Sequence, residues 1–71
     1  MSAMEALKRA IELCGGVTAL ANKIGVKQPV VSMWLQRGQV PAERVLAIET
    51  ATGVSRHDLR PDIYPREEVG A

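Results

Sequence analysis

The stretch from Gln28 to Gln36 carries side chains suited to recognition by hydrogen bonding. Gln28, Ser32 and Gln36 recur at every fourth position, which places them on one face of a helix. Each offers both a donor and an acceptor, and a glutamine amide can pair with two edge atoms of adenine in the major groove of DNA. Pro29 and Met33 flank this face and offer apolar contacts, for example to a thymine methyl group. The pattern predicts base contacts from Gln28, Pro29, Ser32, Met33 and Gln36.

Basic residues accompany this face, and acidic residues are missing from it. Residues 16–42 contain two lysines and one arginine but no Asp or Glu, so this segment carries +3 in a chain whose net charge is only +1. A small basic surface on a nearly neutral chain indicates an anionic partner. The backbone amides that open a helix near Val17 would form a further anion site. We therefore expect phosphate contacts from Val17, Thr18, Lys23, Lys27 and Arg37.

Glycine and proline divide the chain into the elements that must position these residues. Ser2 and Glu5 have the spacing of a capping box, and Ser55 and Asp58 repeat a similar pattern. Apolar residues recur at helical spacing between these signals, and no alternating strand pattern is present. The sequence therefore predicts an all-α fold of four to five short helices. They are expected at about residues 3–14, 18–24, 28–37 and 41–52, with one short turn between Ser55 and Pro61.

Residues 17–36 fit a helix-turn-helix. Ala21 is the small residue where two helices would cross closely, and Gly25 occupies the turn, where a positive φ is needed. The apolar positions that would hold the two helices together are Leu20, Ile24, Val26, Val31 and Trp34. Trp34 could alternatively stack on single-stranded bases, but its place on the inward stripe favours core packing. We expect one helix-turn-helix DNA-binding domain over residues 1–60 and a partly disordered tail over residues 61–71.

The same segments carry a resemblance to a known family. Residues 17–36 resemble the Cro/CI-type phage repressor helix-turn-helix, with Gln28 at the position of the family's base-contacting glutamine. MEALKRAIELCGG, QPVVSMWLQRG, VPAERVLAIETATG and SRHDLRPDIYP together resemble the small Cro-like prophage regulators grouped with the YdaS-like antitoxins. The resemblance covers residues 4–65 and implies a lambda-repressor-like transcriptional regulator, a Cro-like repressor that binds operator DNA as a homodimer. Pro29 departs from the family, where that position is often polar.

Composition excludes several other classes of protein. One cysteine and one histidine cannot supply a disulfide framework or the usual zinc clusters, and no nucleophile–base pair indicates an enzyme. No apolar run approaches the roughly 20 residues that span a bilayer, and the charged N-terminus is unlike a signal peptide. We expect a cytoplasmic protein with no cofactor, no small-molecule ligand and no membrane association. The alternative is an antitoxin-type interaction module that neutralises a partner toxin protein through its C-terminal half, about residues 53–71.

Several residues keep two interpretations at this stage. Cys14 fits a small apolar residue that closes the first helix better than a redox sensor. Arg44 and Arg56 could contact DNA phosphate or simply be solvated. His57 is expected to be a surface or locally hydrogen-bonded residue. The residues that could belong to the core or to a dimer surface are Met4, Val45, Ile48, Leu59, Ile63 and Tyr64.

Overall fold

The computed structural model describes residues 2–65, and these residues form five α-helices and no strand. The prediction of an all-α fold of four to five short helices is confirmed. Each predicted element is present, with bounds that differ from the expected ones by no more than a residue. The helices are α1 (Ala3–Cys14), α2 (Val17–Ile24), α3 (Gln28–Arg37), α4 (Ala42–Thr52) and α5 (Arg56–Leu59).

Local sequence signals explain where the helices begin and end. The Ser2 hydroxyl accepts a hydrogen bond from the Glu5 amide at 3.2 Å, as the first capping pattern predicts. The Ser55 hydroxyl caps α5 in a similar way, because it accepts a hydrogen bond from the His57 amide at 3.1 Å. Gly25 ends α2 at a φ of 77°, in the left-handed region that glycine adopts without strain.

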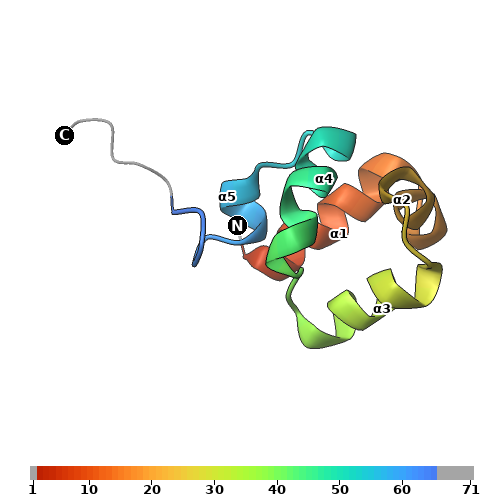
Figure 1. The fold of residues 1–71 in the computed structure, drawn as a ribbon, viewed down its shortest axis with the longest axis horizontal. Helices are drawn as coiled ribbons and strands as arrows, with labels where there is room; N and C mark the ends of the chain where they lie inside the picture. Colours follow the sequence, from red (N-terminus) through yellow and green to blue (C-terminus); the bar gives the residue numbers. More distant parts are fainter. Residues whose placement is uncertain (1, 66–71) are drawn as a thin grey trace.

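In Figure 1, α5 and α4 lie at the left and centre of the domain, α2 lies at the right, and α3 runs along the lower right edge. α1 packs against all four other helices, and α2 packs against α1, α3 and α4. α3 contacts α1 and α2 but neither α4 nor α5 within the described residues. α3 therefore lies at the edge of the domain and is followed by the connection at residues 38–41, which leads to α4.

The core confirms most of the predicted apolar positions. Leu20, Ala21 and Val31 are fully buried and Trp34 is 5% exposed, so Trp34 is a core residue and not a surface stacking platform. On α1 the buried residues are Ala6, Leu7 and Ala10, whereas Met4, Ile11 and Cys14 are half-buried. Sequence analysis also missed two buried residues in the connections between helices, Val40 and Val54.

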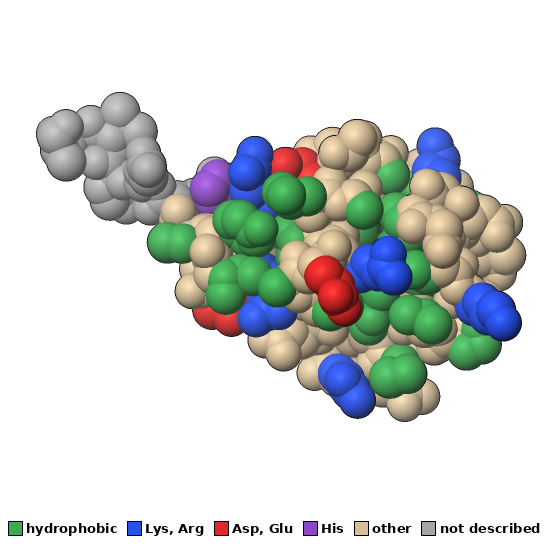
Figure 2. All heavy atoms as spheres, viewed as in Figure 1, with side chains coloured by type: hydrophobic (Ala, Val, Ile, Leu, Met, Phe, Trp, Pro, Cys, Tyr) green, Lys and Arg blue, Asp and Glu red, His purple; other side chains and the backbone are tan. Residues whose placement is uncertain are grey.

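The structure shows which of the undecided residues of the C-terminal half belong to the core. Val45, Ile48 and Leu59 are fully buried core residues. Ile63 is 41% exposed, and Tyr64 is half-buried and packs against the core. Hydrophobic side chains gather over α4 and the segment after α5 on the face shown in Figure 2.

Residues 61–65 follow α5 in a turn that is hydrogen bonded to the helix. The Tyr64 amide donates to the carbonyl of Arg60 at 2.8 Å, and the Tyr64 carbonyl lies 2.8 Å from Nδ1 of His57. The predicted boundary at residue 60 stays a prediction, and residues 66–71 of the predicted tail lie outside the described part. Within residues 2–65, no helix is long and apolar enough to cross a membrane.

Candidate nucleic-acid interface

α2 and α3 are joined by the tight turn that the helix-turn-helix motif requires. The amide of Val26 donates to the carbonyl of Ala21 at 2.9 Å, so the turn closes directly on the last turn of α2. Ala21 itself is 1% exposed, which leaves no space for a longer side chain between the helices. The pair α2–α3 is packed together and also held by α1. This packing holds α3 against the rest of the domain.

α3 has a buried face and an exposed face, as predicted. Val31 and Trp34 hold the helix to the core. On the opposite side, the side chains predicted to contact bases lie toward solvent: Gln28, Pro29, Met33 and Gln36 are exposed, and Ser32 is half-exposed. Met33 is 44% exposed, which is high for so apolar a residue. The structure therefore brings all five predicted base-contacting residues to one accessible surface.

Two of these polar residues are already hydrogen bonded to each other. Nε2 of Gln28 donates to the Ser32 hydroxyl at 3.2 Å, across one turn of α3. This bond restrains the Gln28 amide before any ligand binds, which lowers the entropy lost on binding. Its carbonyl oxygen and its second amide hydrogen stay available, and those are the two groups that a bidentate contact with a base needs.

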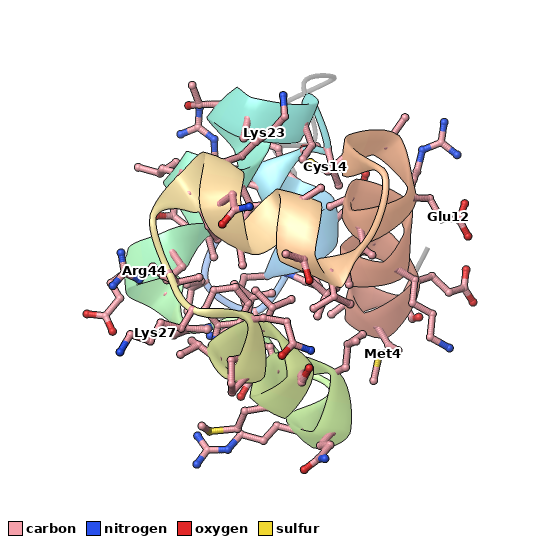
Figure 3. All side chains as sticks on the ribbon, turned by 90° about the vertical axis from the view of Figure 1, so that its right-hand side faces the viewer. Met4, Glu12, Cys14, Lys23, Lys27 and Arg44 are labelled. Carbon is pink, nitrogen blue, oxygen red and sulfur yellow. The ribbon has the colours of Figure 1, made fainter. Side chains whose placement is uncertain are left out.

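The side chains of the predicted phosphate-binding residues do not all point in the same direction. Lys27, Arg37 and Thr18 are exposed, and Val17 is half-buried at the start of α2. Figure 3 shows Lys27 extending from the start of α3, whereas Lys23 extends from α2 on the side away from α3. The structure thus brings Lys27 and Arg37 to the two ends of the exposed face of α3 and leaves Lys23 apart from them.

Arg44 is a further basic residue near this surface that sequence analysis had left undecided. It lies in the first turn of α4, and its side chain extends toward the same side as Lys27 in Figure 3. α3 itself contains no Asp or Glu. In Figure 2, basic and hydrophobic side chains lie over the lower right of the molecule, and an acidic side chain lies beside them near the centre of the view.

The N-termini of α2 and α3 differ from that of α1. Ser2 and Glu5 satisfy the first turn of α1, but α2 and α3 begin at Gly16 and Lys27 with no side-chain cap and no acidic residue in the first turn. Amides left at the start of a helix carry partial positive charge and bind anions. Both helix starts are thus compatible with phosphate, and the phosphate contacts expected of Val17 and Thr18 stay a prediction.

The remaining residues singled out in the sequence lie away from this surface. Cys14 is half-buried against the core, as a small apolar residue would be. Arg56 forms an ion pair with Glu49 at 3.2 Å and lies 5.8 Å from the centre of the Tyr64 ring. Arg56 is thus engaged within the C-terminal half, which favours the structural interpretation for it.

This combination of a helix crossing, a glycine turn and an exposed second helix defines a helix-turn-helix domain. A family model described as "Bacterial toxin YdaS" matches residues 7–68. The chain belongs to the YdaS family. The sequence resemblance pointed to antitoxins within this group, whereas the description of the family model names a toxin.

Two known proteins extend the comparison. The chain is 46% identical over 59 residues to the YdaS protein of Escherichia coli (strain K12), which is provisionally named as a transcriptional regulator. The match covers 79% of this chain and 60% of that protein, so the chain spans little more than half the length of that relative. The Cro protein from the prophage element Xfaso 1 of Xylella fastidiosa strain Ann-1 has 43% sequence identity and a TM-score of 0.81. That similarity covers 93% of this chain and 100% of the Cro chain, and confirms the resemblance to Cro-like prophage regulators.

Proposed function

We propose that the chain is a DNA-binding transcriptional regulator that occupies operator DNA with α3 in the major groove. The observation that carries this proposal is the exposed face of α3, where Gln28, Ser32 and Gln36 lie opposite the buried Val31 and Trp34. The provisional regulator name of the Escherichia coli relative and the Cro name of the Xylella relative support the same function.

In this proposal α3 supplies specificity and the basic residues supply affinity. Gln28 and Gln36 pair with base edges, while Pro29 and Met33 contact bases through apolar atoms. Lys27 and Arg37 neutralise phosphates at the two ends of α3, and the first amides of α2 bind a further phosphate. We include Arg44 among the phosphate contacts and give Lys23 a smaller role, since Lys23 extends away from α3.

Repression by occupancy fits a domain of this size. One recognition helix contacts few base pairs, so a homodimer on a pseudo-palindromic operator is the route to useful affinity. Such a dimer blocks a promoter whenever its concentration exceeds its dissociation constant, and it needs no cofactor.

The test is selection of a binding site from a pool of random DNA duplexes. The wild-type chain should enrich a defined sequence and bind it at least 1,000-fold more tightly than random duplex at the same salt concentration. The double variant Gln28→Ala, Gln36→Ala should stay folded and bind both duplexes with the affinity of the wild type for random DNA. Enrichment of no sequence at all would overturn the proposal.

A second candidate is a protein-interaction module of the toxin–antitoxin type. Two observations favour it: the family model is described as a toxin, and Leu46 and Ile63 are 47% and 41% exposed in the C-terminal half. Controlled expression in a bacterial host separates the two candidates. Growth inhibition that persists in the Gln28→Ala, Gln36→Ala variant would show that a surface other than α3 acts on a partner. Growth inhibition that disappears in this variant would assign the effect to DNA binding.

A further inference from the structure

Arg60 joins the C-terminal turn to the connection that leaves the recognition helix. Its Nη1 donates to the carbonyl of Val40 at 2.7 Å, across 20 residues of sequence. Two further donors of the guanidinium bind Asp62, with Nε 2.9 Å from Oδ1 and Nη2 2.7 Å from Oδ2. All three contacts are charge-assisted, and the pair with Asp62 is bidentate, the geometry that restrains a guanidinium best.

The surroundings of Arg60 hold this contact in place. The Arg60 side chain is 13% exposed, whereas that of Asp62 is 55% exposed. The carbonyl of Arg60 accepts hydrogen bonds from the amides of Ile63 and Tyr64 at 3.2 and 2.8 Å, which closes the turn. The hydrogen bond from Arg60 holds the pKa of the Asp62 carboxyl below its ordinary value.

The far end of the contact lies where α3 is joined to the rest of the fold. Gly38 ends α3, with its amide donating to the carbonyl of Trp34 at 2.8 Å, and Val40 follows two residues later with 1% of its surface exposed. α3 packs directly on α1 and α2 but not on α4 or α5 within the described residues, and the connection at residues 38–41 is its covalent link to α4. The hydrogen bond from Arg60 is therefore a direct tether from the turn at residues 60–64 to the exit of the recognition helix.

We propose that Arg60 is a positioning residue that sets the orientation of α3 through Val40, and so determines how well the domain distinguishes its operator from other DNA. This inference rests on the proposed DNA-binding function. It gives residues 60–64 a role in specificity although none of them lies on the exposed face of α3. Small displacements of a recognition helix misalign its bidentate base contacts, while phosphate contacts through long flexible side chains adapt.

The experiment compares Arg60→Met with Arg56→Met as a matched control. Methionine keeps much of the length of arginine but removes every donor. Arg56 is also a C-terminal arginine with an ion pair, to Glu49, but within residues 2–65 none of its hydrogen bonds or ion pairs joins it to residues 38–41. The probes are the duplex that the wild-type chain enriches from a random pool and a random duplex of equal length. The affinity of each variant for both duplexes is measured at a temperature where circular dichroism shows that the variant is fully folded.

Arg60→Met should lower the ratio of affinities for the two duplexes about tenfold, the contribution of one lost base contact. Arg56→Met should leave this ratio at the wild-type value, even where it lowers the melting temperature. The amide resonances of residues 38–40 should shift in Arg60→Met and not in Arg56→Met. A wild-type ratio in a folded Arg60→Met would overturn the inference, and a wild-type chain that enriches no sequence would overturn the proposed function instead.

Two milder variants decide the matter where Arg60→Met does not fold. Asp62→Asn leaves the guanidinium and its bond to Val40 but weakens the bidentate partner, and Arg60→Lys keeps the charge but cannot reach both partners in the same geometry. The inference expects the ratio to fall in Arg60→Lys and to fall less in Asp62→Asn. Equal wild-type ratios in both variants would contradict it.

Discussion

Truncation of Trp34 to alanine should unfold the domain. Trp34 is 5% exposed and lies on the buried face of α3. A tryptophan buries about 150–250 Å², which at about 25 cal/mol per Å² corresponds to roughly 4–6 kcal/mol of transfer free energy. Alanine retains part of that burial, so the expected loss in free energy of unfolding is about 3–5 kcal/mol. A single core of this size supplies about 3–5 kcal/mol in total, and the variant should therefore be largely unfolded at 37 °C.

Circular dichroism and thermal melting are the assay, with Met33→Ala as the control. Met33 precedes Trp34 by one residue and is 44% exposed, so its truncation should change the free energy of unfolding by no more than about 0.5 kcal/mol. Trp34 is the only tryptophan of the chain, and its fluorescence in the wild type should be protected from iodide quenching. A well-folded Trp34→Ala that merely loses DNA binding would show that the ring lies on the surface and that the phase of α3 is wrong.

Three further expectations follow from other parts of the structure. Gly25→Ala should lower the free energy of unfolding by about 1–2 kcal/mol, because a φ of 77° strains any residue with a Cβ. No atom lies within 4 Å of the new Cβ, so backbone strain is the whole of this cost. Gly25→Asn should lower it less, and equal melting temperatures of the wild type and Gly25→Ala would refute the strain. The hydrogen bond from Arg60 lowers the pKa of Asp62 in the folded protein from 3.8. The stabilisation of the folded state by this pair is therefore present above pH 3.8 and is lost as the pH falls through the lower folded pKa. The difference in melting temperature between the wild type and Asp62→Asn should therefore shrink from pH 6 to pH 2, and a constant difference would contradict the pairing. The selected operator should contain two half-sites about 34 Å apart, and a 1:1 complex of high affinity on one half-site would contradict a dimer.

The helices were predictable because their ends are marked by residues with few alternatives. Gly25 takes up a left-handed conformation, Pro29 occupies the first turn of a helix without loss of a hydrogen bond, and Ser2 caps α1. These effects act within a few residues, so they are visible in the sequence. The orientation of α3 followed as well, since Val31 and Trp34 fix which face is buried.

The features that sequence analysis missed depend on contacts between distant segments. Ala6 and Ala10 are buried because α1 approaches its neighbours closely, and a pattern judged by large side chains does not show this. Val40 is buried in a connection that has no periodicity. The bond between Arg60 and Val40 spans 20 residues, and no local pattern contains it. The identity of the base contacts stays a prediction, because it depends on how the domain lies on DNA.

A salt titration of Gln28→Ala and Lys27→Ala on the selected operator and on random duplex tests the central claim most directly. Gln28 lies on the exposed face of α3 and bonds to Ser32, whereas Lys27 precedes the helix and offers only a charge. Gln28→Ala should lose about 1–3 kcal/mol on the operator and little on random DNA. Lys27→Ala should weaken both equally and lower the salt slope by about one unit, because one fewer counterion is released. Equal weakening of both duplexes by Gln28→Ala would make Gln28 a backbone contact, and no effect of either variant on either duplex would contradict recognition of DNA by α3.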